Sequence, residues 1–241
     1  MTRGRPPLRF IGWDLTDPHA RTPRAVDEAR LDLGGRVAFD QRRWPGPTVD
    51  GGLAPEALVA AFPVGARDVV VVDGPHALAR PGARVRESER LSRAPGRTPD
   101  ELPAPGRPFS GFLRGSVLLF AALRARGGLP LLDVDAATVG EARLFEAFPG
   151  AVWRRLGAPR RGARKASREG REWRREALEA QGLTFPAGVL PTHDQLDAAA
   201  CAWLGWLTRT APWRVTAVGA PLTVDARGWL REGRILHLDA S

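Results

Sequence analysis

The sequence predicts an α/β protein built on one mixed sheet, in which three antiparallel strands are followed by parallel strands, with helices flanking the sheet. Three observations support this fold class. The first part of the chain has three short segments in which apolar and polar residues alternate, as in half-buried antiparallel strands. A run of four valines follows, which is typical of a parallel strand buried on both faces. Later apolar residues have the three- and four-residue spacing of amphipathic helices.

The first three predicted strands form a meander. Pro7–Trp13 ends at Asp14, and the next two alternating segments are separated by Gly34 and Gly35, which is a hairpin signal. The valine run, Asp68–Asp73, is ended by a Gly-Pro pair. Shorter apolar segments predict three further strands. The full set of predicted strands is residues 7–13, 25–33, 36–44, 68–73, 143–148, 222–224 and 234–238.

The predicted helices alternate with the later strands. Ser110 is a suitable N-cap for a long helix, and Gly127 and Gly128 end it. Residues from about 76 to 109 are rich in Pro, Gly and Arg and lack periodicity. We expect one long loop there, and a loop of this length is usually a functional lid or a mobile segment. The predicted helices are residues 55–62, 110–127, 167–180 and 193–209.

The composition excludes several classes of protein. With 241 residues, no internal repeat and no linker, residues 1–241 are expected to form a single domain. The only cysteine, Cys201, excludes an internal disulfide framework and a cysteine-based zinc site. The first ten residues lack the apolar core of a signal peptide, and no apolar run approaches the roughly 20 residues of a membrane span. We therefore expect a cytoplasmic protein without a membrane partner.

The net charge of +9 is concentrated in one part of the chain. From about 151 to 178 there are ten basic residues and three acidic ones. The simplest interpretation is a solvated helix face, but this degree of segregation favours an anionic partner, and we expect nucleic acid. The predicted nucleic-acid-binding residues are Lys165, Arg160, Arg161, Arg164, Arg168, Arg171 and Arg174.

Carboxylates follow the two strands expected at the centre of the sheet. Asp14 ends the first strand and Asp73 ends the buried valine strand. One aspartate after a strand more often starts a turn than forms a site. Two of them on adjacent parallel strands emerge at the same edge of the sheet, so the pair favours a site.

A second pair of carboxylates opens the last predicted helix. Asp194 and Asp197 are three residues apart and so share a helix face, and wholly apolar residues follow Asp197. Three or four carboxylates gathered within about 5 Å repel one another by several kcal/mol unless a cation neutralises them or a proton is taken up. Hard oxygen ligands in this number suit Mg²⁺ or Mn²⁺. We therefore predict that Asp14, Asp73, Asp194 and Asp197 are metal ligands.

Five short motifs then resemble, in order, the landmarks of a family of predicted RNase H-like nucleases, domain of unknown function 429. The resemblance extends from residue 8 to about 205, and the last motif also resembles the Asp-x-x-Asp-Ala helix of Holliday-junction resolvases. The resemblance implies an RNase H-like fold. The motifs are FIGWD (10–14), VVVVDGP (69–75), LFEAFPG (144–150), Lys165-x₄-Gly170-x₃-Arg174-x₃-Leu178 and HDQLDA (193–198).

The resemblance also assigns roles to individual residues. Asp14 and Asp73 match the strand acids of the superfold, and Asp194 and Asp197 match its final-helix pair. Glu146 matches the acid of a Glu-x-x-Pro-like element, either as a residue that reaches the metals or as one that orients the strand end. Lys165, the only lysine of the chain, matches the family lysine. Asp17 and Glu141 lie near these motifs and are expected to be surface residues.

These residues predict a metal-dependent nuclease that hydrolyses phosphodiester bonds by a two-metal mechanism. The predicted catalytic residues are Asp14, Asp73, Asp194, Asp197, Glu146 and His193. His193 either shuttles a proton or merely precedes the helix. Trp153 and Trp173 either stack on bases or pack in the core.

Two other functions fit the same fold class. One is a non-catalytic nucleic-acid-binding or regulatory module, which needs no metal. The other is a phosphotransferase of the actin and sugar-kinase type. Its first strand carries Asp-x-Gly-x-Thr, whereas Asp14-Leu-Thr16-Asp17 lacks the glycine and the chain is short for two lobes. The nuclease prediction is therefore preferred, with DNA, RNA or a nucleotide left open as its substrate.

Overall fold

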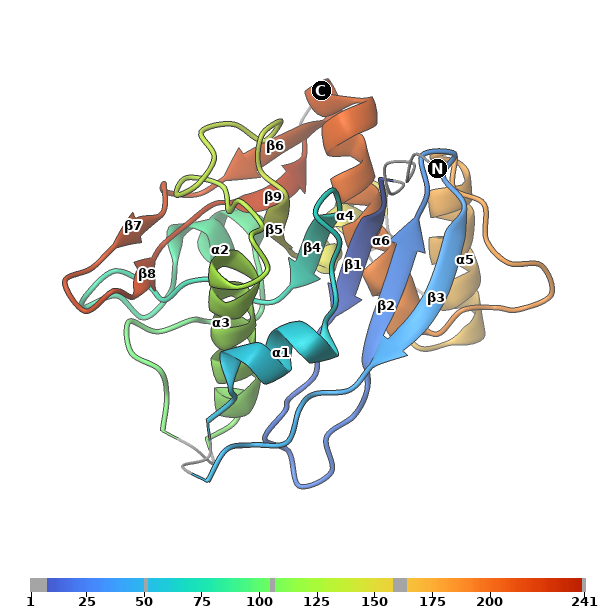
Figure 1. Ribbon diagram of the computed structural model, residues 1–241. Helices are drawn as coiled ribbons and strands as arrows, with labels where there is room; N and C mark the ends of the chain where they lie inside the picture. Colours follow the sequence, from blue (N-terminus) through green and yellow to red (C-terminus); the bar gives the residue numbers. More distant parts are fainter. Residues whose placement is uncertain (1–7, 50–51, 105–106, 158–163, 240–241) are drawn as a thin grey trace, which may run out of the picture.

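The computed structural model describes residues 8–49, 52–104, 107–157 and 164–239 and contains a seven-stranded mixed sheet in the order β3-β2-β1-β4-β5-β9-β6 (Figure 1). Neighbours from β3 to β1 are antiparallel, those from β1 to β9 are parallel, and β6 is antiparallel to β9. The strands are β1 (Phe10–Asp14), β2 (Val26–Leu31), β3 (Val37–Arg42), β4 (Val69–Asp73), β5 (Leu144–Ala147), β6 (Val215–Val218) and β9 (Ile235–Leu238). The predicted fold class is confirmed, and the architecture is compatible with an RNase H-like fold.

Helices cover both faces of this sheet (Figure 1). The helices are α1 (Pro55–Ala61), α2 (Glu87–Ser92), α3 (Ser110–Ala125), α4 (Pro149–Arg155), α5 (Arg168–Glu179) and α6 (His193–Thr210). Helices α1 and α3 pack on one face, and α6 packs on the other with α4 and α5 beside it. No helix among the described residues is long and apolar enough to cross a membrane.

The valine strand shows why the sheet needs two helical layers. Val69 and Val71 belong to the core under α6, whereas Val70 and Val72 belong to the core under α1 and α3. All four valines are fully buried. A strand with helices on both faces has no solvent side, so its sequence is continuously apolar rather than alternating.

The structure adds elements that the sequence pattern did not predict. Helix α2 lies inside the long predicted loop, α4 starts directly after β5, and β6 forms the far edge of the sheet. Thr223–Val224 (β7) pairs with Leu230–Arg231 (β8) in a separate hairpin, while β9 inserts between β5 and β6. At the start of α3, Phe109 rather than Ser110 is the N-cap, and no side chain caps the helix.

Candidate functional site

The two strand carboxylates lie side by side at one edge of the sheet. In the parallel pairing of β1 with β4, Asp14 is the register partner of Asp73. Both are the last residues of their strands, because Leu15 and Gly74 no longer belong to a strand. Parallel strands end at the same edge, which is what the sequence pattern implied for these two residues.

Helix α6 brings the other two carboxylates to the same place. Its N-cap Thr192 accepts a hydrogen bond from the backbone of Gln195, whose side chain accepts from the Thr192 backbone. This capping box starts the helix so that Asp194 lies in its first turn and Asp197 one turn deeper, only 3% exposed. The helix sits very close to β1, because Gly12 has no side chain where a Cβ would clash with the α6 backbone.

The electrostatics show that the four carboxylates act on one another. Burial raises the pKa of Asp14 well above its ordinary value, and the charges of Asp73, Asp197 and Asp194 raise it further. Burial and then the charge of Asp197 raise the pKa of Asp73 to about 7. Burial opposes the change at Asp194, but hydrogen bonds with Asp14 and Arg24 lower the pKa of that carboxyl.

Lys165 is the counter-ion of the helix pair. Its Nζ contacts Oδ2 of Asp197 and lies 3.9 Å from Oδ1 of Asp194. Burial lowers the pKa of Lys165, but Asp197 outweighs this and raises it, so the ammonium is charged at neutral pH. The other oxygens also have donors. Trp153 Nε1 donates to Oδ1 of Asp197 over 2.6 Å, and Arg24 donates to Oδ2 of Asp194 over 2.8 Å.

These pairings determine what the site presents to a cation. Over the described part of the chain, no group of three or more His, Cys, Asp or Glu residues is arranged so that it could hold a metal ion. Lys165 already neutralises the α6 carboxylates, so the strand pair Asp14 and Asp73 carries the unneutralised acidity. The predicted residue His193 lies beside this group, with its Nε2 3.1 Å from Oδ1 of Asp194.

Glu146 lies at the end of β5 but takes part in a different cluster. Its Oε2 accepts hydrogen bonds from the His76 backbone at 3.0 Å and from Arg86 at 2.8 Å, and it lies 2.5 Å from Nδ1 of His76. Its Oε1 accepts from Arg86 as well. Burial would raise the pKa of Glu146, but Arg86 and His76 lower it to about 2. Of the two predicted roles, this geometry favours orientation of the strand end, since Glu146 holds the turn that follows Asp73.

The sequence analysis did not identify Arg86 or His76 as members of this cluster. Arg86 is completely buried and also pairs with Glu89 over 3.2 Å. It lies in the aperiodic segment from 76 to 109, where one arginine among many has no distinguishing neighbour. The only available signal was the position of His76 directly after the Asp-Gly-Pro turn.

The predicted basic residues have mixed surroundings. Arg160 and Arg161 lie outside the described residues. Arg164, Lys165 and Arg168 are exposed, and Arg168 pairs with Glu172 over 2.8 Å. The remaining two, Arg171 and Arg174, are half-buried on α5.

Arg174 supports the Lys165 segment. It donates to the carbonyl of Lys165 over 2.9 Å, and its guanidinium lies over the Trp153 ring. Trp153 is buried and meets Trp173 edge-on, so both rings pack with the core.

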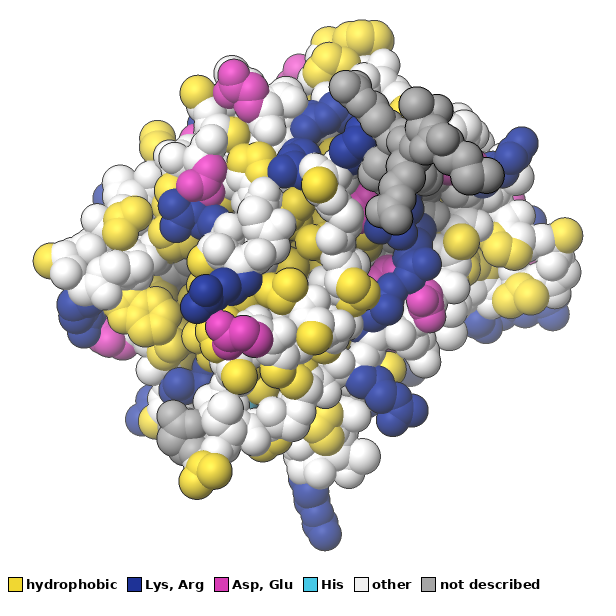
Figure 2. All heavy atoms as spheres, viewed as in Figure 1, with side chains coloured by type: hydrophobic (Ala, Val, Ile, Leu, Met, Phe, Trp, Pro, Cys, Tyr) yellow, Lys and Arg dark blue, Asp and Glu magenta, His cyan; other side chains and the backbone are white. Residues whose placement is uncertain are grey.

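On the face that carries α1 and α3, Lys and Arg side chains are spread among other residues rather than gathered in one patch (Figure 2).

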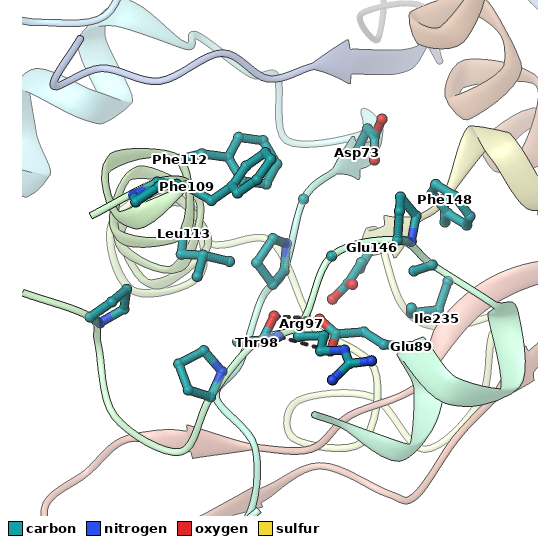
Figure 3. A pocket seen from close by; sticks show the side chains of 18 of the residues that line it. Asp73, Glu89, Arg97, Thr98, Phe109, Phe112, Leu113, Glu146, Phe148 and Ile235 are labelled. Atoms are coloured by element: carbon teal, nitrogen blue, oxygen red, sulfur yellow. Dashed lines mark hydrogen bonds between the residues drawn. The ribbon is translucent and has the colours of Figure 1, made fainter. Parts of the chain in front are cut away.

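Two cavities flank the carboxylates. One, of about 540 Å³, is lined by Asp14, Asp194 and Lys165. The other, of about 620 Å³, has Asp73 at one end and mostly apolar walls (Figure 3). Phe109 and Phe112 at the start of α3 line both. The two cavities therefore share these phenylalanines as a common wall.

A family model described as "Protein of unknown function (DUF429)" matches residues 53–212, which is more than half of the chain. The match includes Asp73, Glu146, Lys165 and the two α6 carboxylates, whereas Asp14 lies before it. No curated protein matches the chain. The predicted family is thereby confirmed, and the RNase H-like assignment stays a prediction.

Proposed function

Because this chain belongs to the DUF429 family, whose function is unknown, we propose from its site that it is a metal-dependent nuclease on an RNase H-like fold. The observation that carries this proposal is the meeting of carboxylates from β1, β4 and α6 at one sheet edge, with the pKa values of Asp14 and Asp73 raised. Perturbed carboxyls in a cleft are typical of functional sites.

The donor set fits a hard divalent cation. Asp14 and Asp73 are adjacent, largely buried carboxylates whose charges repel, and a cation removes that repulsion. Oxygen donors of this kind suit Mg²⁺ or Mn²⁺. Asp14 and Asp73 would hold the ion, and Asp194 and Asp197 would become further ligands only where Lys165 no longer pairs with them. A bound ion would supply an acidified water and a positive charge beside the phosphate. Two-metal hydrolysis additionally requires Lys165 to release the α6 pair.

The remaining residues of the site have roles around this centre. Trp153 fixes the rotamer of Asp197 through its indole hydrogen bond. Lys165 and Arg24 line the cavity that contains Asp14 and provide positive charge for a phosphate backbone. His193, partly exposed and next to Asp194, is positioned to carry a proton to or from solvent. Glu146 supports the turn after Asp73 rather than touching the substrate.

A non-catalytic nucleic-acid-binding module is the second candidate. One observation favours it: the Lys165 ammonium already neutralises Asp197, so this part of the site is stable without a metal. In this alternative, the basic residues bind the phosphate backbone and the carboxylates have a structural role.

Cleavage assays with labelled DNA and RNA of several structures, in the presence of Mn²⁺, test the proposal. We expect cleavage by the wild type, and Asp14→Asn and Asp197→Asn should reduce it by more than the roughly 10–100-fold typical of losing a residue that supports a metal ligand. Glu56→Gln is the matched control, because Glu56 is an exposed carboxylate on α1 and should keep full activity.

Calorimetry separates the two candidate functions. A catalytic centre should bind Mn²⁺, and Asp73→Asn should abolish that binding. If the wild type cleaves nothing and binds no Mn²⁺, the nuclease proposal is wrong, and binding of nucleic acid under the same conditions would support the second candidate.

A further inference from the structure

The cavity beside Asp73 has walls that suit a flat aromatic ring. Phe109, Phe112 and Leu113 of α3 form one side, and Phe148 and Ile235 lie across from them (Figure 3). We propose that this cavity binds one nucleobase of a single-stranded substrate by stacking, without selecting which base. The inference rests on the proposed function, because it assumes that the adjacent carboxylates act on a nucleic-acid phosphate.

The position of the cavity favours a nucleotide over other apolar ligands. Asp73 stands at its end, and Phe109 and Phe112 also line the cavity that holds Asp14 and Lys165. A nucleic-acid strand whose phosphate lies at the carboxylates thus has an apolar recess on one side and a charged cavity on the other. Arg97 and Arg107 line the recess as well and supply positive charge for a neighbouring phosphate.

Phe109 has two properties that point to a ligand. The residue is 75% exposed, although its side chain is one of the larger apolar ones of the protein. Its backbone is left-handed, with a φ of 63°, which a bulky residue rarely adopts. Strained backbone of this kind gathers at ligand-binding sites. Exposed aromatic rings next to positive charge are the means by which proteins bind single-stranded nucleic acid.

Apart from Asp73 and the two arginines assigned to phosphate, the polar side chains of the wall are already paired, which favours binding without base selection. The backbone amide of Thr98 donates to Glu89 over 3.0 Å, and its hydroxyl donates to the same carboxylate (Figure 3). Both oxygens of Glu146 are bound by Arg86 and His76. Prolines, which have no N–H donor, make up much of the remaining wall. These prolines are Pro75, Pro95, Pro99, Pro103 and Pro108.

Stacking without hydrogen-bond reading tolerates any base, because every base has a π face. We therefore expect oligothymidylate, oligoadenylate and oligocytidylate to bind with affinities that differ only by the stacking strength of the base. An abasic oligomer of the same length has the same phosphates but nothing to place in the recess. The difference between intact and abasic oligomers isolates the contribution of the cavity.

Fluorescence anisotropy in EDTA, where no metal-dependent cleavage occurs, measures this difference. The wild type should bind oligothymidylate roughly 5- to 100-fold more tightly than the abasic oligomer. Phe109→Gly should remove this preference and leave abasic binding unchanged. Glycine suits the left-handed backbone, so the variant should fold with an unchanged or higher Tm. Phe109→Trp should retain the preference, as should Trp213→Ala, which removes an exposed aromatic residue elsewhere.

The outcomes distinguish this inference from the proposed function. If the wild type binds both oligomers equally, or if Phe109→Gly keeps the preference, the recess does not hold a base and the inference is wrong. Cleavage in Mn²⁺ would then still support the nuclease proposal. If neither oligomer is bound, the inference is wrong, whereas the nuclease proposal is decided by cleavage of the full DNA and RNA panel and by Mn²⁺ binding. Binding of an apolar peptide or dye that Phe109→Gly abolishes would then identify a different ligand class.

Discussion

Asp73 is a carboxyl group whose ionisation the folded protein opposes. Burial and the charge of Asp197 raise its pKa to about 7, and the pKa of Asp14 is raised for the same reasons. The unfolded chain loses these protons near the ordinary aspartate pKa of about 4. Between these values the unfolded state binds fewer protons than the folded state, so the free energy of unfolding falls as pH rises.

Asp73→Asn should therefore stabilise the metal-free protein at high pH. The amide has nearly the same shape but no charge to lose, so the variant should gain on the wild type between pH 4 and pH 7, by at most about 1.4 kcal/mol per pH unit. Urea unfolding in EDTA at pH 5 and pH 8 measures this. Mn²⁺ should reverse the order at pH 8, because it stabilises only the protein that binds it. A variant less stable than the wild type at pH 8 in EDTA would contradict the argument.

For single residues, the sequence pattern predicted the carboxylates of the site but not the residues with which they pair. Asp14 and Asp73 could be anticipated because each ends a buried strand, and Asp194 and Asp197 because they open an apolar helix. The pairing of Lys165 with Asp197 could not, since it depends on where the tertiary fold places Lys165 relative to α6. An ion pair between residues 32 positions apart leaves no periodic trace.

The arrangement of the site at the level of elements depends on the contact between β1 and α6. A Cβ at Gly12 would clash with the carbonyl oxygen of Ala198, the amide of Ala202 and the Cβ of Cys201. Small residues on α6 and the glycine on β1 together allow a helix and a strand to approach this closely. The approach sets the position of Asp197 relative to Asp14.

Gly12→Ala should separate these two elements. The added methyl group meets backbone on the helix side, which cannot move away as a side chain would, so we expect a loss of about 1–3 kcal/mol or more of stability. The variant should also lose Mn²⁺ affinity, because Asp197 moves with α6. Gly46→Ala is the control, since nothing lies within 4 Å of its Cβ position. Thermal unfolding measures the stability of both variants, and calorimetry measures their Mn²⁺ affinity. Equal stability and equal affinity would show that the position of α6 does not depend on its contact with Gly12.

Among the elements, the long ones could be predicted, and the ones that the sequence pattern missed are short. Helix α1 is also short but could be predicted, because a proline stands in its first turn. Helix α6 and the valine strand have many apolar residues in a regular pattern. Helices α2 and α4 have six and seven residues, too few to show a period above the background. Strand β6 follows directly from a short 3₁₀ turn, Pro212–Arg214. Only its first residue is buried and the other three are partly buried, so no alternation identifies it.

The buried cluster around Arg86 connects parts of the molecule that are far apart in the sequence. This guanidinium contacts Glu146 on β5, Glu89 on α2 and the carbonyl of Glu232 just before β9. The segment from 76 to 109, expected to be an open loop, is thereby attached to the sheet. Glu89 extends the attachment through its hydrogen bonds with Thr98. The attachment positions one wall of the apolar recess as well as the turn after Asp73.

Replacing Arg86 should consequently lower the free energy of unfolding far more than replacing a surface arginine would. Arg86→Met leaves Glu146 buried without its main partner, and breaking one side of a buried ion pair costs about 3–5 kcal/mol. The double variant Arg86→Met, Glu146→Gln removes both charges and should recover part of that loss. Breaking the exposed ion pair between Arg168 and Glu172 is the control. It should change the free energy of unfolding by less than about 1 kcal/mol.

The same cluster gives these variants a distinctive pH dependence. The pKa of Glu146 is about 2 in the folded protein, below its ordinary value, so its stabilisation is present above about pH 4.5 and is lost as the pH falls towards 2. The stability difference between the wild type and the double variant should therefore shrink on acidification. Urea unfolding at pH 7 and pH 3 follows this change. A difference that stays constant over this range would mean that folding does not shift the pKa of Glu146, and that the attachment of the 76–109 segment rests on packing rather than on charge.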